Sequence, residues 1–86
     1  MSREQRIIEL AGGEYLGTQD GMAWYNEPVT HSTMMMDTRT LADAKDHEAA
    51  EFIKILMRRK RQEFAVAAAA AIVRQRAGRV PSLRSE

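Results

Sequence analysis

The segment TLADAKDHEAAEFIKILMRRKRQEFAVAAAAAIVRQRA, residues 40–77, decides the fold of this chain. It lies within residues 29–77, which contain no glycine and no proline, the two residues that most often interrupt a helix. Thr40 followed by Asp43 resembles a capping box at its start, and Gly78 is suited to end it. The segment therefore predicts a helix over residues 40–77, about 55 Å long at ~1.5 Å per residue.

The apolar residues of this helix do not form a single stripe. One stripe runs along the first half, and polar residues interrupt it around residues 58–63. Either one helix with a partner for each half or two helices with a turn near residues 58–62 explains this pattern. The absence of glycine, proline, asparagine and serine there favours one helix. The first stripe holds Leu41, Ala44, Phe52, Ile55 and Leu56. In the second half of the helix, Val66, Ala70 and Val73 lie on the same face as this stripe. A different face, near that of Ile53 and Met57, holds Phe64, Ala68 and Ile72.

The run of alanines at residues 67–71 predicts close helix packing. Alanine is the strongest helix former, and its short side chain lets two helix backbones approach closely. The partner surface is either the chain's own core or a second copy, and a chain this short gains most from a second copy. We therefore predict a dimer or higher oligomer. The predicted interface residues are Phe64, Ala67, Ala68, Ala71 and Ile72.

The net charge of +1 hides an uneven distribution. Residues 1–57 hold ten acidic and five basic residues, whereas residues 58–86 hold eight basic and two acidic residues. Such a chain can bind nucleic acid with its basic end, or it can pair head to tail with a second copy.

The N-terminal half predicts smaller elements. Residues 3–11 form a short helix with Ser2 as its cap, and the glycines that follow end it. Residues 14–37 form an antiparallel meander of two or three strands, with a hairpin turn at Gly21. Alternation places Trp24 and Tyr25 on opposite faces of this sheet.

Together these elements predict an α+β fold: a short N-terminal helix, a small β-meander and one long C-terminal helix. We expect a single domain over residues 1–79 and a flexible tail over residues 80–86. The chain has no cysteine and no apolar run of the roughly 20 residues that cross a bilayer. Its first residues do not predict a secretion signal. A cytoplasmic protein without membrane contact is expected.

Two groups of polar residues have the side chains that catalytic or metal sites use. Asp43, His47 and Glu51 share a helix face, but a solvent-exposed face explains them better than a metal site that lacks a second histidine. His31, Ser32 and Asp37 are the residue types of a nucleophilic site, but no nucleophile elbow surrounds Ser32. The sequence therefore predicts no enzyme activity, no metal and no cofactor.

The predicted partner contacts are aromatic and basic. One of the two sheet aromatics can be exposed for a partner, although core packing also explains them. The basic residues 58–61 spread around the helix axis. They can form a solvated segment that bridges the two halves of the helix, or they can bind phosphate or an acidic protein. The contacts predicted from these features are Trp24, Tyr25, Arg58, Arg59, Lys60 and Arg61.

Residues 24–33, WYNEPVTHST, resemble aromatic–acidic–Pro–x–Thr–Gly–Ser–Thr hairpins of small uncharacterised bacteriophage proteins. His31 stands where those hairpins have glycine. The resemblance covers about ten residues. It implies a phage or prophage origin, a hairpin followed by a helix, and no enzymatic activity.

These features favour a non-enzymatic, phage-type interaction protein that associates with itself and masks a macromolecular partner, such as a host factor or defence system that it inhibits. One alternative is a nucleic-acid-binding module that uses the basic segment with Arg74 and Arg76 on phosphates. A second alternative is a sponge for a small anionic nucleotide, bound between subunits.

Overall fold

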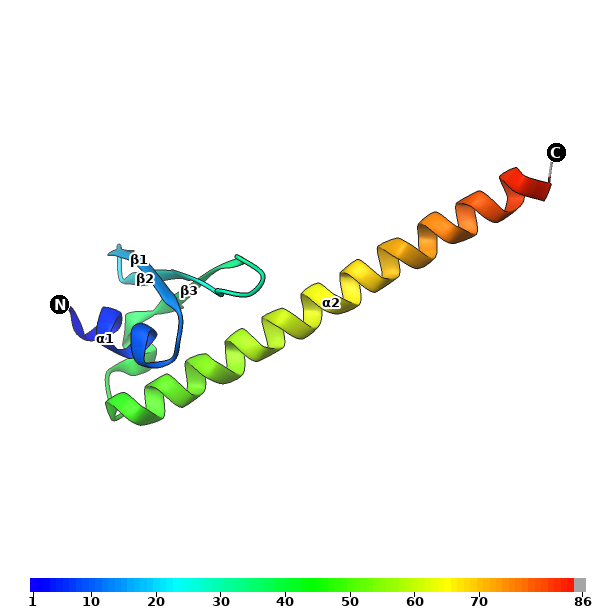
Figure 1. Cartoon of the computed structure of the whole chain (residues 1–86). Coiled ribbons are helices and arrows are strands. Elements are labelled where there is room, and N and C mark those ends of the chain that lie inside the picture. The colour runs from blue at the N-terminus through cyan, green and yellow to red at the C-terminus, as the bar shows by residue number, and fades with distance from the viewer. Residues whose placement is uncertain (85–86) are drawn as a thin grey trace.

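The computed structural model describes the backbone of residues 1–84 and the side chains of residues 1–77. It confirms the predicted α+β fold. Residues 1–57 form a packed head, and the last helix continues beyond it, so the molecule measures 63 Å by 22 Å by 18 Å (Figure 1). The elements are α1 (Arg3–Leu10), β1 (Glu14–Gln19), β2 (Met22–Asn26), β3 (Thr33–Asp37), a short 3-10 helix η1 (Thr38–Leu41) and α2 (Asp46–Arg84).

Helix α1 begins and ends as its sequence predicts. The Ser2 hydroxyl accepts a hydrogen bond from the Gln5 amide at 3.1 Å. At the other end Gly12 has a φ of +88°, and the Gly13 amide donates to the Ile8 carbonyl at 2.9 Å. This pattern is a Schellman motif, which requires the left-handed conformation that glycine adopts without steric cost.

The sheet is a three-stranded antiparallel meander in the order β1-β2-β3. Asp20 and Gly21 join β1 to β2 with φ values of 53° and 76°, so both central residues of this two-residue turn have positive φ. Trp24 is exposed and Tyr25 is buried, which confirms the predicted alternation of the two faces. Strand β2 ends at Asn26, two residues before Pro28, which lacks the amide that a continuing strand would use.

The core lies between α1, the inner face of the sheet and the first turns of α2. Ile7 and Ile8 come from α1, and Ala23 and Tyr25 come from β2. All four are fully buried. The other buried apolar residues of this cluster are Ala11, Met36, Leu41, Ala49, Ala50, Ile53 and Met57.

Helix α2 begins later than predicted. Thr40 lies in η1 rather than at a helix N-cap, and α2 starts at Asp46. The Arg3 guanidinium explains the delay, because it donates to the carbonyl oxygens of Leu41 (2.6 Å) and Ala44. These oxygens would otherwise accept the amides of a continuous helix. Arg3 also donates to Asp46 at 3.1 Å and so fixes the start of α2 against α1.

The helix is continuous through residues 58–62, so the alternative with a turn there is wrong. The first apolar stripe, which includes Phe52 and Ile55, faces the core only in part. Ile53 and Met57 face the core, whereas Phe52 and Ile55 are 43% and 44% exposed. The head thus packs on the face of α2 next to the predicted one.

The helical backbone extends past Gly78 to Arg84. The flexible tail expected at residues 80–86 stays a prediction, since its last two residues lie outside the described part of the chain.

Candidate protein-binding surfaces

Beyond the head, α2 carries apolar side chains that no other described part of the chain covers. We call residues 62–77 the arm. Its Phe64, Val66, Ile72 and Val73 are exposed by 54%, 69%, 52% and 64%. Large apolar side chains repeated along an unpacked helix are typical of a surface that another helix covers.

The arm presents two different apolar faces. One continues the line of Ile53 and Met57 beyond the head, and we call it the inner stripe. The other lies on nearly the opposite side of α2, and we call it the outer seam. The inner stripe consists of Phe64, Ala67, Ala68, Ala71 and Ile72, which is the interface predicted from the sequence, and the outer seam consists of Phe52, Ile55, Val66 and Val73.

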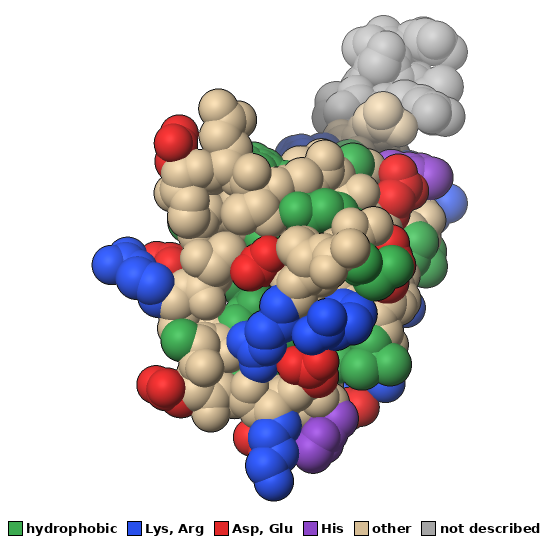
Figure 2. Space-filling model, turned by 90° about the vertical axis from the view of Figure 1, so that its left-hand side faces the viewer, with side chains coloured by type: hydrophobic (Ala, Val, Ile, Leu, Met, Phe, Trp, Pro, Cys, Tyr) green, Lys and Arg blue, Asp and Glu red, His purple; other side chains and the backbone are tan. Residues whose placement is uncertain are grey.

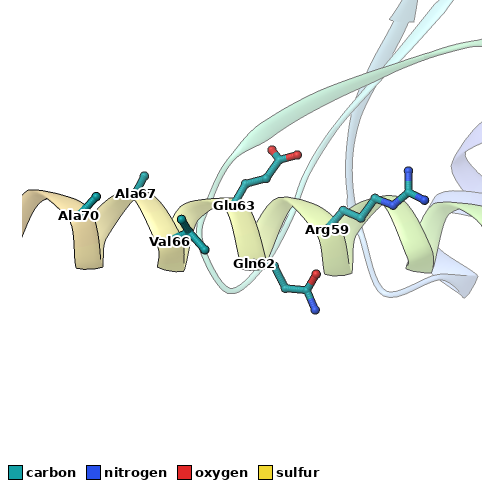
Figure 3. Close-up of a pocket in the computed structure, with 6 residues that line it drawn as sticks. All are labelled: Arg59, Gln62, Glu63, Val66, Ala67 and Ala70. Carbon is teal, nitrogen blue, oxygen red and sulfur yellow. The ribbon is translucent and has the colours of Figure 1, made fainter.

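A shallow groove runs along the outer seam (Figure 3). All of its lining residues belong to α2, so it is a surface feature of one helix rather than a cleft between elements. Long side chains form one end of the groove and small ones the other. The lining residues are Arg59, Gln62, Glu63, Val66, Ala67 and Ala70.

The basic residues 58–61 do not form one patch. Arg61 turns toward the head and lies 3.5 Å from the Glu27 carboxylate. Lys60 pairs with Glu63 at 3.6 Å along the helix. The other two arginines of the segment are exposed on different sides of the helix axis. The structure therefore does not bring the four predicted basic contacts together, nor does it place them beside the aromatic ones.

Glu27, for which the sequence predicted no role, is the buried charged residue of the head. Its side chain is 1% exposed. The carboxylate accepts the amides of Val29 at 3.1 Å and Thr30 at 2.7 Å, as well as the Thr30 hydroxyl at 3.0 Å. The sequence signal for this role was the position of Glu27, two residues before Val29 and three before Thr30 in a turn, from which a carboxylate can accept their backbone amides. Glu27 thus orders the β2–β3 loop and, through Arg61, holds it against α2.

Electrostatics around Glu27 favour its charged form. Burial alone would raise the pKa of Glu27, but the hydrogen bonds from Val29 and Thr30 and the charge of Arg61 outweigh it. The pKa therefore lies below its ordinary value. The same loop contains His31 with a φ of +61°. Glycine is the residue that such a left-handed backbone favours.

The outer face of the sheet offers a smaller apolar surface. Trp24 is 38% exposed and stands opposite Met35 on β3, which is 57% exposed. On its other side it pairs with Gly17, and a shallow hollow lies there against the half-exposed Leu16. Trp24 is therefore accessible, as predicted for one of the two aromatics.

Tyr25 corrects a prediction. Its side chain is fully buried, so it cannot contact a partner while the head is folded. Its hydroxyl has no hydrogen-bond partner among the described residues, and burial raises its pKa. The ring of Tyr25 therefore serves to fill the core of the head.

The end of the head away from the arm has a mixed surface. Basic and acidic side chains alternate there, and hydrophobic side chains occur only in small patches (Figure 2). His47 and Glu51 are exposed. No group of three histidine or carboxylate side chains gathers within the described residues. Within the same residues, none of the helices combines the length and the apolar character needed to cross a bilayer.

No family model, no curated protein and no solved structure matches this chain. The proposals that follow therefore depend on its surfaces alone.

Proposed function

We propose that this chain is a non-enzymatic interaction protein that associates through the α2 arm and masks a macromolecular partner. The observation that carries the proposal is the arm itself. Phe64, Val66, Ile72 and Val73 are all more than half exposed over a helical segment that makes no core of its own. Burying an apolar side chain of this size contributes about 1.5–3 kcal/mol, so leaving four of them in water is costly.

A second copy of the chain is the occupant that suits the arm. Acidic residues dominate up to residue 57 and basic residues dominate beyond it, so two antiparallel copies bring opposite charges together. The head packs on the same side of α2 as the inner stripe. A parallel copy on that stripe would place two heads side by side, whereas an antiparallel copy keeps them apart. Since the two apolar faces lie on nearly opposite sides, covering both takes more than one neighbour.

The partner that is masked would contact the outer face of the sheet. Trp24, Leu16 and Met35 form an exposed apolar group on adjacent strands, and tryptophan is among the residues enriched in protein-binding hot spots. The arm and this face are separate surfaces. Self-association therefore leaves the sheet free to bind a protein.

Sedimentation velocity at several concentrations tests the self-association. We expect the unmodified chain to sediment as a dimer or larger species in the micromolar range, and Phe64→Glu, which disrupts the inner stripe, to shift it toward a smaller species. The matched control is Gln19→Glu, which adds the same charge to an exposed position of β1 in the head. A monomer at every concentration, or equal effects of the two variants, would contradict the proposal.

Affinity capture from a bacterial lysate tests the masking role. A protein retained by the unmodified chain should be lost with Trp24→Ala and kept with Thr33→Ala, which alters an exposed polar residue of β3. Nuclease treatment should leave the capture unchanged. If nuclease abolishes it, nucleic acid is the ligand and the basic segment becomes the binding surface.

A further inference from the structure

The outer seam has the spacing of a helix that supercoils around a partner. Counting in sevens from Phe52 reaches Val66 and Val73, and counting in sevens from Ile55 gives a second series three residues further along. Such alternating steps of three and four residues keep a seam facing one neighbouring helix. The remaining positions of the two series hold Arg59, Gln62, Ala69 and Arg76.

The two arginines in the seam decide its orientation. In a parallel, in-register pair Arg59 would meet Arg59 of the second copy, and Arg76 would meet Arg76. Like charges in direct contact are destabilising. In an antiparallel pair each series meets the other series, so no arginine faces its own copy.

One antiparallel register gives the residues of the seam suitable partners in the second copy. Placing Ile55 level with Val73 of the second copy puts Arg59 opposite Ala69, where the small side chain leaves room for the guanidinium. It also puts Arg76 opposite Phe52, an arrangement that allows a cation–π contact. The groove of Figure 3, where long side chains give way to alanines, provides the matching relief on each copy.

The flank of the seam is complementary in the same register. Glu51 borders the seam next to Phe52, and the antiparallel register that sets Arg76 of the second copy opposite Phe52 brings its guanidinium within reach of the Glu51 carboxylate. Two-fold symmetry repeats this pair at the other end. Within one chain Glu51 pairs only along the helix surface, with Lys54 at 3.1 Å. Both partners are exposed and available.

Building on the proposed self-association, we propose that the outer seam pairs antiparallel with the outer seam of a second copy. Ile55 lies against Val73 and Glu51 bonds Arg76 across the pair. The head does not obstruct this contact, because Ile53 and Met57 hold it on nearly the opposite side of α2.

Disulfide trapping tests the register directly, because the chain contains no cysteine of its own. Ile55→Cys and Val73→Cys are made as two separate proteins, mixed, and oxidised in redox buffer. A disulfide needs Cα atoms within about 7 Å, so it forms only between apposed positions. We expect disulfides between unlike variants and almost none between like variants. Intact mass distinguishes a disulfide between unlike variants from the two possible disulfides between like variants, since the two variants differ in mass by one methylene.

Charge reversal provides an independent readout. Glu51→Arg and Arg76→Glu should each raise the dissociation constant of the pair, roughly tenfold for two facing ion pairs. The double variant should recover most of the affinity, because each ion pair is then reversed rather than lost and only the contact of Arg76 with Phe52 stays missing. Disulfides between like variants, or a double variant that is weaker than either single one, would overturn the antiparallel seam. If sedimentation still shows assembly, self-association stands without this seam; a monomer in sedimentation overturns both.

Discussion

Replacing Glu27 by alanine should destabilise the head far more than replacing Arg61, its ion-pair partner. The buried Glu27 carboxylate accepts two amides and a hydroxyl within 3.1 Å, whereas the Arg61 guanidinium lies 3.5 Å away and its side chain is 43% exposed. Hydrogen bonds to a charged group contribute about 1.5–3 kcal/mol each, but the freed loop amides can reach water after the side chain is removed. We therefore expect Glu27→Ala to cost about 3 kcal/mol.

Arg61→Ala should cost no more than about 1 kcal/mol, because solvent screens the exposed partner of this pair. For a domain of this size 1 kcal/mol corresponds to roughly 4–8 °C in Tm. Glu27→Ala should then lower Tm by roughly 12–24 °C and Arg61→Ala by at most about 8 °C. Trp24, the single tryptophan, lies in the head, so its fluorescence reports unfolding of the head rather than of the arm.

Thermal and urea unfolding should be compared at one protein concentration, since self-association raises apparent stability. Glu27→Gln, which keeps one acceptor oxygen, should fall between the two alanine variants. If Arg61→Ala costs as much as Glu27→Ala, the ion pair rather than the loop hydrogen bonds stabilises this region, and the reasoning is wrong.

Three further outcomes follow from the same structure. The pKa of Glu27 is lowered in the folded chain, so its contribution is fully present above its ordinary pKa of about 4.5 and is lost as pH falls through the folded value. Acid titration should therefore destabilise the unmodified chain more steeply than Glu27→Gln; Asp37, with a pKa of about 2, is unchanged between them. Tyr25→Phe should raise the free energy of unfolding by about 1 kcal/mol in urea titration, because it removes a buried hydroxyl without a partner, and a loss of stability would reveal a partner for that hydroxyl. His31→Gly should stabilise the β2–β3 loop by up to about 1 kcal/mol and His31→Val should destabilise it, and the reverse order would contradict the left-handed φ of +61°.

Local signals predicted the elements of this fold well. The lack of helix breakers across residues 58–62 predicted a continuous helix, and Gly21 predicted the hairpin turn. Ser2 and Gly12 act only on neighbours within four residues, so the ends of α1 could also be read from the sequence. Alternation along β2 separated the faces of Trp24 and Tyr25.

Contacts between distant residues were beyond the sequence. Arg3 delays α2 by bonding carbonyl oxygens some forty positions away, and no local pattern indicates this. Phe52 and Ile53 are both strongly apolar, so the helical periodicity of the sequence did not indicate which of them faces the head. The Glu27–Arg61 contact joins a loop to a helix, and no sequence pattern indicated which basic residue of the segment would turn toward the head.

A second copy that covers the arm in solution should protect its amides from exchange. A helix as short as the arm is only marginally stable in water by itself, so uncovered arm amides should exchange rapidly. Hydrogen exchange followed by mass spectrometry at low and high protein concentration measures this directly. We expect protection of residues 62–77 that increases with concentration, while the head stays equally protected at both. Rapid exchange of the arm that does not depend on concentration would show that no second copy covers it.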